Sequence, residues 1–201
     1  KSLLIRKKFS SQGLENKKYE GLSVKKISDR EEKRALDWLL DNFLDLDSRD
    51  DLFIATLLNN NFNNVSKLLN HDQSLITLSD AGAHLSFFCD SGFGLHLLGY
   101  WVREKNIMSI EQAVYQISAR QADICRIPKR GRLVPGYYAD MILFDPRTVN
   151  VSESYIKNDL PGPSDRLIAD PIGLYGVWVN GIKQVNENNI SSGVVIRNFF
   201  S

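Results

Sequence analysis

The chain has 201 residues, enough for about one domain, and its 43% hydrophobic and 24% charged residues are ordinary proportions for a globular protein. A net charge of +1 gives no electrostatic reason to expect a nucleic-acid partner or an acidic membrane surface, and no apolar run approaches the ~18–20 residues of a membrane span. Two cysteines cannot build a disulfide framework, so we expect a reducing, cytoplasmic setting.

The N-terminal part is expected to contain a short strand and a long helix. The strand is predicted at the apolar Leu3–Ile5. Ser28 and Glu31 have the spacing of a capping box, so a helix is predicted to begin at Ser28. Apolar residues at helical spacing continue this helix to Phe43, and a polar stretch at residues 45–51 ends it.

The middle of the chain alternates between predicted helices and one predicted strand. Apolar residues at helical spacing predict a helix over Phe62–Leu69 that ends near His71. The apolar Leu75–Leu78 predicts a short buried strand, which leads directly into a loop at Ser79–His84. Another helix is predicted over Phe93–Glu104.

A capping box at Ser109 and Gln112 predicts a helix that runs to about Arg120, and a short helix is predicted over Ala122–Ile127. After this point turn residues and short apolar runs replace the helical pattern. The sequence therefore predicts an α/β domain at residues 1–130 and an all-β domain at residues 131–201.

Strands dominate the predicted C-terminal domain. Ala139–Phe144 and Leu174–Val179 have strand character, and a last edge strand is predicted at Val194–Ile196. The pair Asn180-Gly181 follows the second of these strands and is a strong hairpin signal, because both turn residues must take positive φ. Ile182–Val185 is the predicted return strand.

Asp80 is the clearest candidate catalytic residue. It follows a predicted strand and opens a glycine-containing loop, the position from which a barrel enzyme projects its catalytic groups. A carboxylate there can bind a metal ion or accept a proton from water. Local pattern alone equally allows a simple turn acid at Asp80. His84 lies in the same loop and is either a ligand or substrate contact, or a structural histidine.

The remaining reactive residues carry weaker signals. His96 falls among leucines of a predicted helix and is interpreted as a packing or surface residue, and His71 as exposed. Cys89 is interpreted as a buried apolar thiol. The motifs H-x-H, HExxH and GxSxG are absent from the sequence, so three scattered histidines do not predict a complete zinc site.

Several short motifs follow one another along the chain from about Lys18 to Arg197. They are Lys18–Gly21, Leu78–His84 with Cys89-Asp90, Leu97–Arg103, Gly131–Gly136, Ala139–Asp145, Asp159–Gly162 with Arg166, Val177–Gly181 and Gly193–Arg197. In this order they resemble the motifs of N-acyl-D-amino-acid deacylases (D-aminoacylases) of the amidohydrolase superfamily.

The resemblance implies a (β/α)₈ metal-dependent hydrolase barrel joined to a small β-sandwich. A barrel alone needs about 250 residues. We therefore expect a partial fold, in which residues 1–130 supply the last barrel units and residues 131–201 supply C-terminal sandwich strands. The metal-binding histidines of the family come from earlier strands and have no match here, so the chain is expected to be a fragment or the product of a truncated gene.

The resemblance also implies a function. It implies zinc-dependent hydrolysis of a non-peptide amide C–N bond in a small molecule, such as the deacylation of an N-acyl-D-amino acid. Asp80 would be the catalytic base and would also touch a metal site, and His84 would contact the substrate.

Three alternatives stand beside this interpretation. The chain is a non-catalytic remnant that lacks the metal ligands, or its family chemistry is cyclic-amide opening or deamination, which an aspartate such as Asp80 also serves. An unrelated binding module would require the ordered motifs to be coincidence.

Overall fold

The computed structural model describes residues 2–6, 16–19, 22–44, 52–56, 59–77, 79–83, 85, 89–162, 164–184 and 192–197. The chain divides into two compact units, Lys1–Lys67 and Leu68–Ser201. The second unit therefore contains both the later helices and all strands that follow residue 131. The predicted domain boundary at residues 130/131, which refers to the family fold, stays a prediction.

The first unit combines a two-stranded sheet with short helices. β1 (Ser2–Arg6) pairs antiparallel with β2 (Leu52–Thr56), which confirms the predicted N-terminal strand. The helices are η1 (Asn16–Tyr19), α1 (Val24–Arg30) and α2 (Ala35–Leu44). Their buried side chains form one core, made of Tyr19, Val24, Ile27 and Trp38.

The predicted helix start at Ser28 is wrong. Helix α1 begins earlier, because Ser23 caps it by accepting a hydrogen bond from the amide of Lys26. Ser28 lies inside α1, is buried, and donates its hydroxyl proton to the carbonyl of Lys25. Glu32 takes a positive φ of 53° just after the helix, so α1 and α2 are separate. Val24 packs into the core, and this packing places the start of the helix before the capping-box pattern at Ser28.

Helices also form the first part of the second unit. α3 (Phe62–Leu69) contains the boundary between the units and confirms the predicted helix there. α4 (Phe93–His96), η3 (Leu97–Glu104), α5 (Ile110–Ile117) and α6 (Ala119–Ile124) follow. Their core contains Leu97, Leu98, Met108, Ala113 and Val149.

The predicted capping box of α5 is confirmed. The Ser109 hydroxyl accepts a hydrogen bond from the Gln112 amide at 3.2 Å, and the Gln112 side chain accepts one from the Ser109 amide at 2.9 Å. The predicted helix over residues 93–104 also forms, but its second half, η3, is a π-helix. The amide of Lys105 accordingly bonds to the carbonyl five residues earlier, that of Tyr100.

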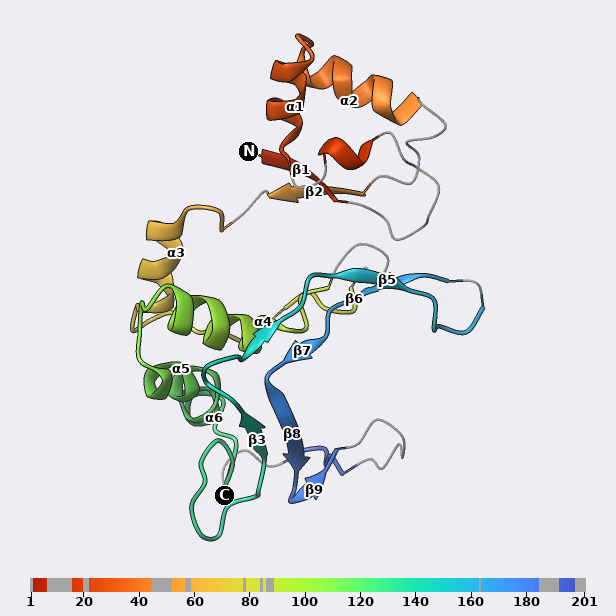
Figure 1. The fold of residues 1–201 in the computed structure, drawn as a ribbon. Helices are drawn as coiled ribbons and strands as arrows, with labels where there is room; N and C mark the ends of the chain where they lie inside the picture. Colours follow the sequence, from red (N-terminus) through yellow and green to blue (C-terminus); the bar gives the residue numbers. More distant parts are fainter. Residues whose placement is uncertain are drawn as a thin grey trace. The chain divides into compact units, whose positions relative to one another are not determined.

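The strands after the helices form nested antiparallel pairs (Figure 1). β3 (Met141–Phe144) pairs with β8 (Leu174–Val179), β4 (Asn150–Val151) with β7 (Pro171–Ile172), and β5 (Tyr155–Lys157) with β6 (Arg166–Ile168). Each later pair lies inside the earlier one in the sequence. We call this arrangement the ribbon, and its end at residues 157–166 the ribbon tip.

The predicted hairpin at Asn180-Gly181 is confirmed. β8 has the predicted bounds, and it pairs with β9 (Ile182–Lys183) to give a three-stranded sheet in the order β3-β8-β9. Asn180 and Gly181 have φ of 51° and 80°, as the tight turn requires. Arg130 also stabilises this turn by donating a hydrogen bond to the side-chain oxygen of Asn180 at 2.7 Å.

Two predicted strands are wrong over the residues that the structure describes. Residues 75–77 are extended but pair with no described strand, and Leu78 lies outside the described residues. Val194–Ile196 is also not a strand. The nearby Ser192 is instead held by side chains, since Asn180 donates to its carbonyl and Gln184 to its hydroxyl.

The described part of the chain is mixed α/β, as predicted. All of its strand pairs are antiparallel, whereas a (β/α)₈ barrel is built from parallel strands. The barrel units therefore stay a prediction. A membrane-crossing helix, which would have to be long and apolar, is not found in these described segments.

Candidate functional site

Asp80 is reached through an extended segment that helix α6 anchors. The carbonyl of Asp72 accepts a hydrogen bond from the Arg120 guanidinium, and the carbonyl of Ile76 accepts one from the Gln121 amide. The side chain of Ile76 packs against the core of the second unit. Two polar side chains of helix α6 thus satisfy backbone carbonyls of a segment that pairs with no described strand.

The turn that carries Asp80 is set by local chemistry. The amide of Ala83 donates to the carbonyl of Asp80 at 2.9 Å, and the amide of Ala81 donates to the Ser79 hydroxyl at 3.3 Å. Gly82 has a φ of 94° at the third position of this turn, a conformation that glycine adopts without strain. The predicted loop at Asp80 is therefore confirmed over residues 79–83.

The Asp80 side chain is exposed. None of the described residues donates a hydrogen bond or forms an ion pair with its carboxylate. The two roles predicted for this residue, accepting a proton and binding a cation, stay predictions.

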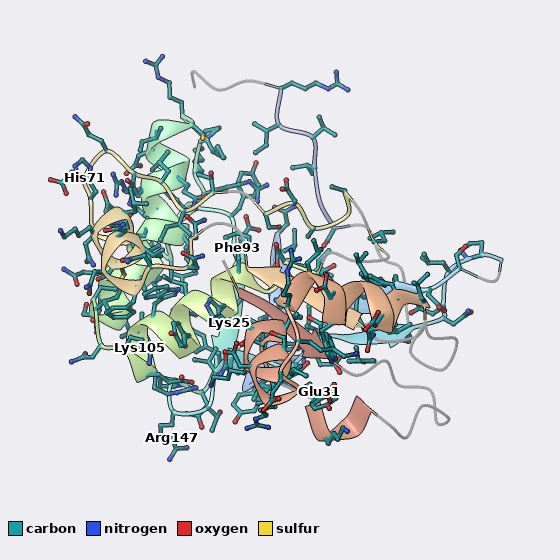
Figure 2. The ribbon with its side chains drawn as sticks, turned by 90° about the horizontal axis from the view of Figure 1, so that it is seen from above. Lys25, Glu31, His71, Phe93, Lys105 and Arg147 are labelled. Atoms are coloured by element: carbon teal, nitrogen blue, oxygen red, sulfur yellow. The ribbon has the colours of Figure 1, made fainter. Side chains whose placement is uncertain are left out.

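Among the described residues, His71 and His96 do not form a metal-binding group with Asp80. His84 lies outside the described residues. His71 is exposed, and its Nδ1 accepts a hydrogen bond from the Gln73 amide. Figure 2 shows His71 well apart from Phe93, which begins α4. His96 stacks on Tyr100 at 5.0 Å between ring centroids, and the burial of the stacked ring lowers its pKa despite nearby Glu104 and Asp90.

A complete metal centre is not seen within the described ranges, where no three His, Cys, Asp or Glu side chains gather. The described residues therefore do not fit a zinc ion by themselves, since a catalytic zinc needs three protein ligands. A hollow of about 240 Å³ lies elsewhere, between Arg132 and Ala139, and is not lined by Asp80.

Strand β6 contacts the segment that follows the Asp80 turn. The amide of Leu167 donates to the carbonyl of Leu85 at 2.8 Å. Leu167 pairs with Ile156 across the ladder, and this amide points away from β5, so β6 uses its outer edge to hold Leu85. This contact and the bonds from Arg120 and Gln121 could not be predicted from local patterns, because each joins residues more than 40 positions apart.

Comparisons with known proteins identify relatives of this chain. Residues 27–182 match the profile of the amidohydrolase family. The N-acyl-D-aspartate deacylase of Alcaligenes xylosoxydans xylosoxydans is 31% identical over 86 residues, which cover 43% of this chain and 16% of that protein. The D-aminoacylase of the same organism is 31% identical over 85 residues, or 42% of this chain and 16% of that protein.

A solved structure is also similar. The N-acyl-D-glutamate deacylase from Bordetella bronchiseptica, crystallised with zinc and a phosphonate inhibitor, gives a TM-score of 0.46 at 22% identity. The match covers 92% of this chain and 35% of that one, so the chain spans about a third of the length of that enzyme. Since the family profile covers most of its residues, the chain belongs to the amidohydrolase family, and within that family it resembles the D-aminoacylases.

Proposed function

We propose that this chain supplies the catalytic carboxylate of a metal-dependent amidohydrolase, and that Asp80 is this carboxylate. The observation that carries the proposal is an exposed aspartate, without a described hydrogen-bond partner, on a turn fixed by Gly82 in a chain of this family. The reaction we propose is hydrolysis of an amide C–N bond outside peptides. An N-acyl-D-amino acid is the proposed substrate, since the relatives of known activity are named for such substrates.

The chemistry assigned to Asp80 is proton transfer. Its carboxylate accepts a proton from the water that attacks the amide carbon, and then gives this proton to the departing amine nitrogen. An exposed carboxylate that is not committed to another side chain can make both transfers without breaking an existing bond. We propose zinc as the cofactor, which Asp80 would also contact, and His84 as a substrate contact.

The proposed fold follows from the same family membership. We propose that residues 1–130 belong to the last units of a (β/α)₈ barrel and residues 131–201 to a β-sandwich. The change from helices to antiparallel strands after α6 supports this division. A cytoplasmic location is proposed as well, in agreement with the free thiols of Cys89 and Cys125.

The test compares two aspartates in the full-length protein encoded by the gene. Asp80→Asn removes the proposed base, and Asp72→Asn makes the same chemical change at an exposed residue of the neighbouring turn. Release of amino acid is measured with N-acetyl-D-aspartate, N-acetyl-D-glutamate and their L-isomers. We expect Asp80→Asn to lower kcat by about 10²–10⁴-fold, the usual contribution of a general base, and Asp72→Asn to change it little.

Two further measurements accompany the assay. Zinc content by elemental analysis is expected to stay the same in Asp80→Asn, and circular dichroism is expected to show an unchanged fold. If kcat of Asp80→Asn stays near that of the wild type, the base role is wrong.

The second candidate is a non-catalytic remnant. It is favoured by the lack of a three-ligand cluster among the described side chains. Near-stoichiometric zinc in the purified protein would contradict this candidate, whereas a protein free of zinc and inactive on the whole panel would support it.

A further inference from the structure

The ribbon tip contains a compact charge cluster. Lys157 and Arg166 are direct partners across the β5–β6 ladder, so two positive charges face each other where the ladder ends. Like charges in this position destabilise a strand pair. The Asp159 carboxylate offsets this repulsion, because it accepts bonds from Arg166 Nε at 2.5 Å and Nη2 at 2.7 Å and pairs with Lys157 Nζ at 3.1 Å.

The side chains of this cluster are partly buried and are held by a two-pronged bond. The Asp159 side chain is 27% exposed and that of Arg166 is 35% exposed, so both are partly shielded from water. The two-pronged bond from Arg166 holds the pKa of the Asp159 carboxyl far below its usual range. A forked bond of this kind also fixes the direction of the arginine side chain.

The cluster is directly connected to the segment after Asp80. Leu167, the residue after Arg166, donates its amide to the Leu85 carbonyl at 2.8 Å. Strand β6 therefore contacts this segment at Leu85, five positions beyond Asp80.

We propose that Asp159 and Arg166 are positioning residues for Asp80. Their ion pair fixes the end of β6, the amide of Leu167 then holds Leu85, and the turn at residues 79–83 is thereby held in place. This inference rests on the proposed function of Asp80 for its catalytic consequence. Its mechanical part, the link from the ion pair to the turn, concerns the structure alone.

The matched variants lie in one hairpin of the full-length protein. Asp159→Asn keeps the shape of the side chain and removes the negative charge that pairs with Lys157 and Arg166. Asp159→Glu keeps the charge and serves as the rescue variant. Asp165→Asn is the control, because its carboxylate accepts a bond from the Asn158 side-chain amide and, among the described residues, takes no part in the cluster.

The first readout does not depend on activity. Hydrogen exchange resolved to single amides, by fragmentation mass spectrometry, follows Leu167 and Ala83, whose amides bond to Leu85 and Asp80. We expect both to exchange about tenfold faster in Asp159→Asn and to be unchanged in Asp159→Glu and Asp165→Asn. Unchanged exchange in Asp159→Asn, or faster exchange throughout the second unit, would overturn the proposal.

The second readout is kinetic. We expect Asp159→Asn to lower kcat about tenfold, within the roughly 10²-fold loss that a 1 Å misplacement can cause, with KM little changed. Because the effect of Asp159 on kcat acts through Asp80, adding Asp159→Asn to the Asp80→Asn variant should lower kcat no further. If the two substitutions lower kcat independently of each other, the proposal is overturned. If the wild type is inactive, the proposed function has failed, while the exchange of Ala83 and Leu167 still decides the mechanical link.

Discussion

Substitution of Gly99 tests the close packing between the π-helix and the ribbon. Gly99 is buried in η3, and a Cβ added there would meet the carbonyl oxygen of Val149 and lie 2.9 Å from the Asn150 side-chain oxygen. The Val149 oxygen also accepts a hydrogen bond from Arg103 Nη1 at 2.5 Å. A methyl group at residue 99 must therefore displace backbone that already has a bonded partner.

The expected loss follows from three contributions. Overpacking a close contact costs about 2 kcal/mol, and weakening a hydrogen bond to a charged donor costs about 1 kcal/mol more. Replacing glycine by alanine in a helix returns about 1 kcal/mol. We therefore expect Gly99→Ala to lower the free energy of unfolding by about 2 kcal/mol, which for this size of protein lowers Tm by about 4–8 °C.

Gly94→Ala is the matched control in the same helical run. A Cβ at Gly94 would have its nearest neighbour, the Ile117 side chain, at 3.9 Å, which is an ordinary contact. We expect this variant to be as stable as the wild type or slightly more stable. The assay is thermal and urea unfolding followed by circular dichroism. Equal stability of the two variants would refute the packing of Gly99 against Val149.

Two further predictions concern a turn and a histidine. Gly181→Val should lower the free energy of unfolding by about 1–3 kcal/mol, because φ is 80° there, whereas Gly193→Val has open space and should change Tm little. The pKa of His96 is lowered in the folded protein, so folding favours the neutral imidazole. The contribution of His96 to the free energy of unfolding is therefore fully present above the unfolded pKa of about 6.5 and is lost as pH falls below it. His96→Gln should therefore show a smaller drop in Tm between pH 7.5 and pH 5.5 than the wild type; an equal drop would contradict this.

Local chemistry made some features predictable from the sequence. The capping box of α5 and the Asn180-Gly181 turn involve only residues within three positions of one another, and both formed as predicted. The turn at Asp80 was likewise visible, because Gly82 stands where positive φ is needed.

Other features depended on distant partners and could not be predicted. The run Leu75–Leu78 has the composition of a buried strand, but the carbonyl of Ile76 is bonded by Gln121, a side chain on a helix. Ser28 has a capping pattern, yet burial of Val24 and Ile27 beside Trp38 starts α1 earlier. The hydrogen bond from β6 to Leu85 likewise depends on the strand pairing of the ribbon, and the sequence pattern does not reveal the register of that pairing.

The nested pairing of the ribbon also has a consequence for how the chain folds. Pairing of Lys157 with Arg166 closes a shorter loop than any other strand pair of the ribbon, so its entropic cost is the lowest. Once β5 and β6 are joined, β4 and β7 are already close, and after them β3 and β8. We therefore expect assembly to proceed like a zipper from the tip toward the three-stranded sheet, with the Asp159–Arg166 pair formed early.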